Sequence, residues 1–403
     1  MVEINNVISE GQSLTFDIKG NQETGLSKSV INAIRRTLLS SIPTVAFRTL
    51  IDDSDIRILE NTTPLHNEFM LHRISLIPLY LDPDTYENQY LFYLDVEGSD
   101  SSPVTTITAK DFQVYPLKDS VNGKDIEELN LANYDRQNPL SEEEKAKIFR
   151  PFQYNGKDSY CIVTELRNTS SKQKQKLRLY GVPSVSYAYE DARWQSVSRA
   201  TYQFKIDEDL FQSILQEKIK ISNIQNVEEY SNSLRISEAE RYFYRDTSME
   251  PYWYTMTIDS VHQKTPKELF LKACEIIIEQ CGILKEEFKS LSSGKETILQ
   301  LTNPSEAIFH IVCHGYDDTM GNLIQNHISG MIDENTTIQS CGYKRVHPLE
   351  EKIKWVVGMN PGHPISGQST PQKISEIVKV FHTSLDKLVE QFQGIIQEAT
   401  TSL

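Results

Sequence analysis

Basic residues are scarce in this 403-residue chain, which carries 41 Lys and Arg against 56 Asp and Glu and a formal net charge of −15. Nucleic-acid binders need clustered positive charge, so DNA binding by the chain itself is not expected. Long apolar runs are also missing, and none approaches the roughly 18 residues of a membrane-spanning helix. The first residues, MVEINNVISEGQ, lack the basic and apolar regions of a signal peptide. We expect an intracellular protein with no membrane partner.

Cysteine is scarce and scattered. No two cysteines have the C-x-x-C spacing of a structural zinc site, so the sequence predicts no metal and no cofactor. An odd number of dispersed cysteines indicates free thiols in a reducing compartment. The five are Cys161, Cys274, Cys281, Cys313 and Cys341.

Clustered carboxylates for two-metal chemistry are missing as well. The nearest group, Asp52, Asp53 and Asp55, is typical of a turn beside a strand. We therefore predict no catalytic residue in this chain.

One short block does combine metal-ligand types, namely His66, Glu68 and His72. The spacing differs from H-E-x-x-H, and two histidines six residues apart lie about 120° from each other around a helix. We predict no metal site here, and a metal-dependent hydrolase remains an alternative hypothesis.

The stretch from Ser27 to Phe47 has the pattern of an amphipathic helix, and the rest of the chain is interpreted around it. We call it the organising helix. Ser27 or Ser29 can cap a helix that Pro43 ends. Arg35 and Arg36 lie mid-helix, and periodicity alone is equally typical of an ordinary core helix with solvated arginines. Its apolar positions recur at the spacing of one helical face, at Val30, Ile31, Ile34, Leu38 and Ile42.

The middle of the chain, from about residue 80 to 240, alternates short β-rich runs with polar loops. Two stretches, 118–147 and 167–176, have the composition of surface loops or local disorder. A basic run, Lys172, Lys174, Lys176 and Arg178, is typical of a solvated loop, with a nucleic-acid contact as the alternative.

A strand, YWYTMTIDSV, precedes a long predicted helix that opens at Thr265-Pro266 and runs to about Lys289. A short Ser- and Gly-containing linker follows. Two further strands come next, with Asn303-Pro304 as the expected turn.

A second copy of the organising helix lies in YDDTMGNLIQNHISGMI. Asn322 lies 290 residues after Asn32, and Ile324 then matches Ile34, which indicates an internal duplication. The second copy lacks the arginine pair. Beyond it, residues from Ile374 to Phe392 form a heptad-like seam, which can pack on its own domain or on the helix ending near Lys289.

These blocks resemble α-like subunits of multisubunit RNA polymerases. NAIRRTLLSSIP is similar to their dimerisation helix, and LHNEFMLHRISLIPL and RWQSVSRATYQF resemble the third-largest eukaryotic subunit and archaeal D. GYKRVHPLEEKI resembles archaeal L and the eleventh eukaryotic subunit, although Asp318 stands where that family has His. Many members carry a four-cysteine cluster for zinc or iron–sulfur in the inserted domain, but only Cys161 lies near that region here.

The resemblance implies an α+β fold with two α-like dimerisation domains in one chain, each a sheet packed on long helices. The first would comprise 1–65 and 241–289, interrupted by a mostly β inserted domain at 66–240. A linker at 290–295 would lead to the second, smaller domain at 296–403. A fusion of this kind resembles what large DNA viruses encode, which would place the protein in the virion and host cytoplasm, with the nucleus as the alternative.

The resemblance also implies a function, which is non-catalytic assembly within a DNA-directed RNA polymerase, a nucleotidyltransferase complex. Expected partners are the largest and second-largest subunits and the small zinc-bearing subunits, with DNA reached only through the complex. Arg35 and Arg36 are the candidate large-subunit contacts. An α-like scaffold or regulator outside transcription is the alternative. The predicted internal interface comprises Ile31, Ile34, Leu38, Leu323, Ile324, Ile328, Phe381, Leu385 and Leu388.

Overall fold

The computed structural model describes residues 2–21, 25–50, 53–86, 89–99, 102–117, 138–167, 174–222, 226–238, 241–261, 264–292 and 297–403. The chain forms two compact units, each with its own sheets and core. Unit 1 is Met1–Leu39, Arg199–Asp259 and Pro266–Leu403, and unit 2 is Ser40–Ser198 and Ser260–Thr265. Antiparallel sheets combined with helices confirm the predicted mixture of helix and strand.

The first sheet of unit 1 has the strand order β1-β2-β16-β15. Residues 3–19 form a hairpin of two strands, because Gly11 has a φ of 61° and makes a turn between them. Leu14, Phe16 and Ile18 share the buried face of the second of these strands. The strands are β1 (Glu3–Glu10), β2 (Ser13–Lys19), β15 (Val197–Phe204) and β16 (Trp253–Ser260).

The organising helix is α1 (Lys28–Ser40), and it ends before Pro43 as predicted. Its apolar face is buried from Val30 to Leu38. Because the buried positions recur every three to four residues, the helix places one stripe of side chains in the core and leaves the opposite side polar.

The second sheet of unit 1 has the order β17-β18-β20-β19, and α7 (Asp318–Met331) connects β18 to β19. The turn expected at Asn303-Pro304 lies later, because β17 continues to Ser305, which pairs with Ile308. The strands are β17 (Leu299–Ser305), β18 (Ile308–His314), β19 (Ile338–Arg345) and β20 (Lys352–Met359).

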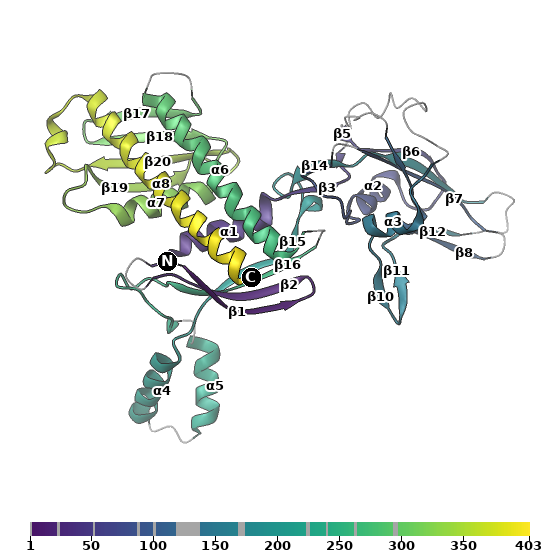
Figure 1. Ribbon diagram of the computed structural model, residues 1–403, viewed down its shortest axis with the longest axis horizontal. Helices are drawn as coiled ribbons and strands as arrows, with labels where there is room; N and C mark the ends of the chain where they lie inside the picture. The colour runs from purple at the N-terminus through teal and green to yellow at the C-terminus, as the bar shows by residue number, and fades with distance from the viewer. Residues whose placement is uncertain are drawn as a thin grey trace. The chain divides into compact units, whose positions relative to one another are not determined.

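Two long antiparallel helices, α6 (Pro266–Ser292) and α8 (Thr370–Ser402), lie side by side in unit 1 (Figure 1). Helix α6 continues past its predicted end at Lys289. We call the first sheet with α1 and α6 the first half of unit 1, and the second sheet with α7 and α8 the second half. Each long helix also contacts the other half's sheet, α6 at β17 and α8 at β1, where the Ile4 N–H donates to Glu398 Oε1 (3.3 Å).

A pair of helices that was not predicted, α4 (Glu208–Ser222) and α5 (Val227–Glu238), belongs to unit 1 between β15 and β16 (Figure 1). They share a small core of Phe211, Leu215 and Leu234. The apolar residues of α4 do recur at helical spacing, at Leu210, Phe211, Ile214, Leu215 and Ile219, so this helix was predictable from the sequence and was missed.

Unit 2 is mainly β-stranded, with a sheet of order β6-β13-β7-β9 and shorter pairs β12-β8, β14-β3, β10-β11 and β4-β5. Its core includes edge-to-face contacts of Phe92 with Phe47 and Phe149. The strands are β3 (Pro43–Ala46), β4 (Thr49–Leu50), β5 (Asp53–Ser54), β6 (Ile56–Asn61), β7 (Tyr90–Glu97), β8 (Val104–Thr108), β9 (Gln113–Pro116), β10 (Phe152–Tyr154), β11 (Lys157–Ser159), β12 (Ile162–Arg167), β13 (Lys176–Gly181) and β14 (Ser184–Tyr187).

Unit 2 also contains the helices α2 (Asn67–Ser75) and α3 (Glu142–Ile148). The two stretches predicted as loops are 118–147 and 167–176. Residues 118–137 of the first and 168–173 of the second lie outside the described residues. The prediction is wrong for the end of the first stretch, because Ser141 and Glu144 form a capping box that starts α3.

Among the described residues, no helix combines the length and apolar character needed to cross a membrane.

Candidate functional site

Helices α1 and α7 begin with the same kind of cap. In α1 the N–H of Ser29 donates to Ser27 Oγ (3.1 Å), and in α7 the N–H of Thr319 donates to Asp317 Oδ1 (2.9 Å). A side-chain oxygen at this position satisfies an N–H group that the first helical turn leaves unpaired. Both helices therefore start at a capping side chain followed two residues later by a hydroxyl group.

A side chain of α1 binds the cap of α7. Arg36 donates through Nη2 to Asp317 Oδ2 (2.9 Å) and through Nε to Thr319 Oγ1 (2.8 Å). Thr319 Oγ1 in turn donates to Asp317 Oδ2 (3.0 Å). The side chains of Arg36 and Asp317 are 36% and 29% exposed, so the ion pair is partly shielded from water. Such charge-assisted hydrogen bonds are stronger and more directional than neutral ones.

The reciprocal contact joins the cap of α1 to a side chain of α7. Ser27 Oγ and Ser29 Oγ both donate to Asn326 Oδ1, at 2.6 and 3.0 Å. This contact is neutral. Because residue 27 meets residue 326 while residue 36 meets residue 317, the two helices run in opposite directions along each other.

The apolar residues predicted for this helix contact all lie in the core. Each has 0% of its surface exposed, and burial of this area from water favours the association of the helices that carry it. The six are Ile31, Ile34 and Leu38 in α1, and Leu323, Ile324 and Ile328 in α7.

The second layer of contacts joins α6 to α8. Phe381 of α8 packs against Phe288 of α6 with ring centroids 4.6 Å apart, and Trp355 of β20 meets Phe381 edge-to-face at 5.6 Å. The predicted residues Phe381, Leu385 and Leu388 are fully buried. The heptad-like seam therefore packs against another helix, which was one of the two alternatives.

His327 links α7 to α8, since its Nδ1 lies 2.9 Å from Ser384 Oγ. Burial lowers the pKa of His327 to about 4, and the cation of Lys387 acts in the same direction. The imidazole is therefore neutral at pH 7 and serves as a polar packing group between the helices.

The two arginines that were predicted as external contacts lie in different surroundings. Arg36 binds the cap of α7, whereas Arg35 donates to Asn32 Oδ1 on its own helix (2.9 Å). Sequence reasoning missed Ser27, Asp317 and Asn326 as contacts, although the 290-residue offset relates Ser27 to Asp317.

Comparison with known families finds a matching family model for the first part of the chain. Residues 22–281 match the family model described as the RNA polymerase Rpb3/Rpb11 dimerisation domain, and this match spans more than half of the chain. The chain belongs to this family.

Curated relatives are subunits of DNA-directed RNA polymerases. Subunit rpac1 of polymerases I and III from Dictyostelium discoideum is 25% identical over 316 residues, 71% of this chain and 82% of the relative. Subunit RPB3 of polymerase II from Schizosaccharomyces pombe is 24% identical over 276 residues, 65% of this chain and 80% of the relative. Subunit Rpo3 from Methanopyrus kandleri is 26% identical over 188 residues, and the chain spans only 55% of that relative.

In this Rpb3/Rpb11-type chain, His66 lies at the N-terminus of α2, and Glu68 and His72 lie within that helix. His66 is the N-cap of α2, and its Nδ1 accepts from the N–H of Glu68 (3.5 Å). Within the part of the chain that the structure describes, no three His, Cys, Asp or Glu side chains gather so as to hold a metal ion. His66 thus has a local structural role.

The acidic and basic runs are held in ion pairs. Asp53 pairs with Arg48 at 2.9 Å, while Lys176 pairs with Asp95 at 3.6 Å and Arg178 with Glu60 at 3.9 Å. Asp52 and Lys172 lie outside the described residues. The two basic residues of β13 therefore pair with neighbouring strands of their own sheet.

Four of the five cysteines are buried, and Cys161 is exposed. Burial raises the pKa of the Cys281, Cys313 and Cys341 thiols to about 12. These thiols stay protonated at neutral pH, so they behave as apolar packing groups.

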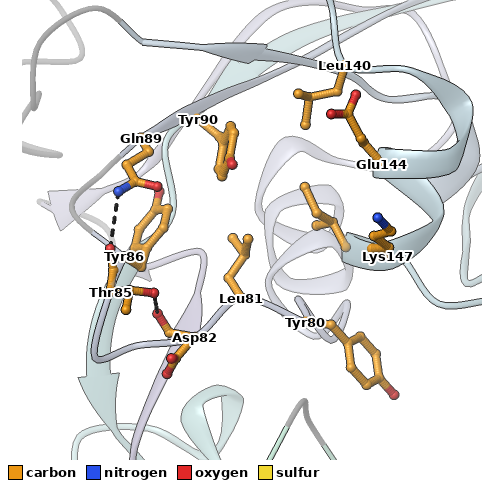
Figure 2. A pocket seen from close by; sticks show the side chains of 11 residues that line it. Tyr80, Leu81, Asp82, Thr85, Tyr86, Gln89, Tyr90, Leu140, Glu144 and Lys147 are labelled. Carbon is orange, nitrogen blue, oxygen red and sulfur yellow. Dashed lines mark hydrogen bonds between the residues drawn. The ribbon is translucent and has the colours of Figure 1, made fainter.

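A hollow of about 300 Å³ in unit 2 is lined by Tyr80, Leu81, Asp82, Thr85, Tyr86, Gln89, Tyr90, Leu140, Glu144, Lys147 and Ile148 (Figure 2). Several of its polar side chains form hydrogen bonds with nearby backbone groups. Gln89 donates to the Thr85 carbonyl (3.1 Å), Thr85 Oγ1 to the Asp82 carbonyl (3.4 Å), and Glu144 caps α3. These contacts stabilise loops and give no arrangement of nucleophile and base.

Proposed function

We propose that this chain is a non-catalytic assembly platform of a multisubunit DNA-directed RNA polymerase, in which two α-like dimerisation domains form one intramolecular heterodimer. The platform binds and positions the two largest subunits, and it reaches DNA only through the complex. The observation that carries this proposal is the reciprocal helix contact of α1 with α7 inside a member of the Rpb3/Rpb11 dimerisation family.

The matching plan of the two halves supports a fusion of two related domains. The strand order β1-β2-β16-β15 in the first half corresponds to β17-β18-β20-β19 in the second, position by position. In each half a helix follows the second strand and a long helix follows the last. Helices α1 and α7 also begin 290 residues apart, at Lys28 and Asp318.

The family match ends at residue 281, so the second half enters the proposal through its geometry. Each long helix contacts the sheet of the other half, as subunits of an intertwined dimer would. A covalent link between the halves raises their effective concentration to the millimolar range for a short flexible linker. The fusion therefore makes the dimer independent of free-subunit concentration.

The names of the relatives support the polymerase assignment. The Dictyostelium and Schizosaccharomyces relatives are subunits of polymerases I and III and of polymerase II. By this relationship the partners are the largest and second-largest subunits, together with small zinc-bearing subunits. The proposed inserted domain, 66–240, overlaps unit 2 from residue 66 to residue 198. The location follows that of the polymerase, including the virion and host cytoplasm for a viral enzyme.

Arg35 is the stronger of the two candidate contacts to a large subunit. Arg36 is held by Asp317 inside the chain, whereas Arg35 bonds to Asn32 on its own helix. Arginine is enriched at protein interfaces because its planar group makes several directional hydrogen bonds.

The deciding experiment is co-purification from the native setting, with an affinity tag at the C-terminus and moderate salt. We expect two very large chains in one-to-one ratio with this chain. The Arg35→Ala variant should recover less of one large chain while keeping the wild-type Tm. Arg199→Ala, which removes an exposed arginine paired with Asp259, is the matched control and should recover both.

Purification of the chain alone, or with unrelated proteins, would refute the polymerase platform. The alternative, an α-like scaffold or regulator outside transcription, would then be favoured, because the dimerisation fold would remain while its polymerase partners were missing.

A further inference from the structure

The polar contacts between α1 and α7 obey the same 290-residue offset as the helices. Ser27 corresponds to Asp317, Ser29 to Thr319, and Arg36 to Asn326. In each contact, the cap of one helix is bound by a residue that lies nine positions after the cap of the other helix. Asp317 is bound by Arg36, nine positions after Ser27, and Ser27 is bound by Asn326, nine positions after Asp317. The structure therefore contains one contact twice, in two chemical versions.

The two versions differ in charge. The contact at the α7 cap joins a guanidinium to a carboxylate, with Arg36 Nη2 at 2.9 Å from Asp317 Oδ2. The contact at the α1 cap joins two hydroxyl groups to an amide, at Asn326 Oδ1. The first half thus carries a cation and a neutral cap, and the second half carries a neutral side chain and an anionic cap.

We propose that these six residues form a pairing code that makes a first half bind a second half and rejects a second copy of itself. This inference rests on the proposed heterodimer of the two halves, and it assigns specificity to Ser27, Ser29, Arg36, Asp317, Thr319 and Asn326.

A pairing of two first halves, or of two second halves, would lose these complementary contacts. Two first halves would place Arg36 against Ser27 and Ser29 at both ends, so each partly shielded guanidinium would face no carboxylate. Two second halves would place Asp317 against Asn326 at both ends, leaving two carboxylates without a cation. Charge mismatch at partly shielded positions disfavours a wrong partner, which is how interfaces obtain specificity.

The apolar faces carry no charge that would reject a wrong partner. Ile34 corresponds to Ile324 and Leu38 to Ile328, whereas Ile31 corresponds to Gly321 and Ala33 to Leu323. Burial of apolar surface is non-directional and favours all pairings of such faces. A single polar contact in an otherwise apolar helix interface is known to select partner and orientation.

The test uses the full chain and exchanges the three contact residues of one half for those of the other half. The triple variant Asp317→Ser, Thr319→Ser, Asn326→Arg gives both halves the first version. The reciprocal triple variant Ser27→Asp, Ser29→Thr, Arg36→Asn gives both halves the second. We expect each to lower Tm by about 3 to 8 °C. The variant with all six substitutions swaps the versions and should recover most of the wild-type Tm.

Two results would overturn the code. Triple variants with the wild-type Tm would show that the contact does not discriminate, and a six-fold variant that loses the sum of both triple losses would show that the two versions are not interchangeable. Lys28→Gln is the control, because it removes an exposed ion pair with Glu250 from the same helix and should shift Tm little.

The measurement needs no polymerase. A chain that fails to co-purify with large subunits can still show recovery in the six-fold variant, and a chain that assembles normally can fail to show it. The pairing code and the assembly function are therefore tested separately.

Discussion

Asp55 is buried in unit 2 with 2% of its surface exposed, although it is an ionisable side chain. Its Oδ2 accepts from the N–H of Arg48 (2.7 Å) and from Ser184 Oγ (2.6 Å). Burial raises the pKa of Asp55 to about 6, against the hydrogen bonds and the Arg48 cation that favour the charged form. Desolvation is therefore the larger effect at this residue.

This balance predicts an unusual dependence of stability on pH. A folded-state pKa above the unfolded one means that the folded chain binds more protons between about pH 4 and 6, so this contribution to stability falls as pH rises through that window. We expect Asp55→Asn to raise the free energy of unfolding by about 3 kcal/mol at pH 7.5 and by about half as much at pH 5. Urea unfolding at the two pH values measures both.

Asp53→Asn is the control for this variant. Asp53 is a neighbouring carboxylate that pairs with Arg48 at 2.9 Å and is partly exposed, so its loss should not raise stability. A decrease in stability for Asp55→Asn at pH 7.5 would show instead that the carboxylate is needed to hold Ser184 and the backbone of Arg48.

At the same scale, the sequence revealed the buried apolar positions of α1 and α7 but not the polar contacts between the two helices. Ile31, Ile34 and Leu38 stand out because they repeat with the helical period. Ser27 and Asn326 are ordinary polar residues in isolation, and only the offset between the two helices pairs them with a partner. Side-chain pairing between distant segments depends on tertiary geometry, which no local pattern encodes.

Gly321 shows how one residue lets an element approach its sheet. It lies in α7, and a Cβ there would come within 2.8 Å of the Tyr343 ring on β19. The indole N–H of Trp355 also donates to the Gly321 carbonyl (3.2 Å), which fixes this turn of the helix to β20. The missing side chain is therefore part of the packing of α7.

We expect Gly321→Ala to lower the free energy of unfolding by about 1 to 3 kcal/mol, because overpacking outweighs the better helix propensity of alanine. Gly330→Ala in the same helix is the control. Nothing lies within 4 Å of its Cβ position, so it should be neutral or stabilise by up to about 1 kcal/mol. Thermal unfolding of both variants decides the question, and equal effects would contradict the packing argument.

Elements were predictable where the sequence pattern was long and regular. The helices α1, α6 and α8 follow from apolar periodicity. The β1–β2 hairpin has only a weak sequence signal, because a single glycine, Gly11, makes the turn. Helix α4 was missed although its apolar residues recur at helical spacing, because the surrounding region was interpreted as β-rich runs and polar loops.

For the molecule as a whole, the proposed heterodimer joins two halves of one chain, so its formation would be intramolecular. We expect the Tm of the chain to stay constant over a hundredfold range of protein concentration, since only intermolecular association depends on concentration. Differential scanning calorimetry at several concentrations measures this. A Tm that rises with concentration would show that the halves pair between molecules.

The bond from the Ile4 N–H to Glu398 Oε1 connects residues that are 394 positions apart. Ribosomes add about 5–20 residues per second, so β1 waits roughly 20 to 80 s before the helix that it contacts exists. In the finished sheet β1 is an edge strand that α8 contacts, and before α8 is made β1 lacks this neighbour. An uncovered edge strand is the part of a sheet most prone to pair with another chain. We therefore expect the nascent chain to be prone to wrong pairing for a long period, so that its yield in the cell would depend on protection at the ribosome as well as on the stability of the finished fold.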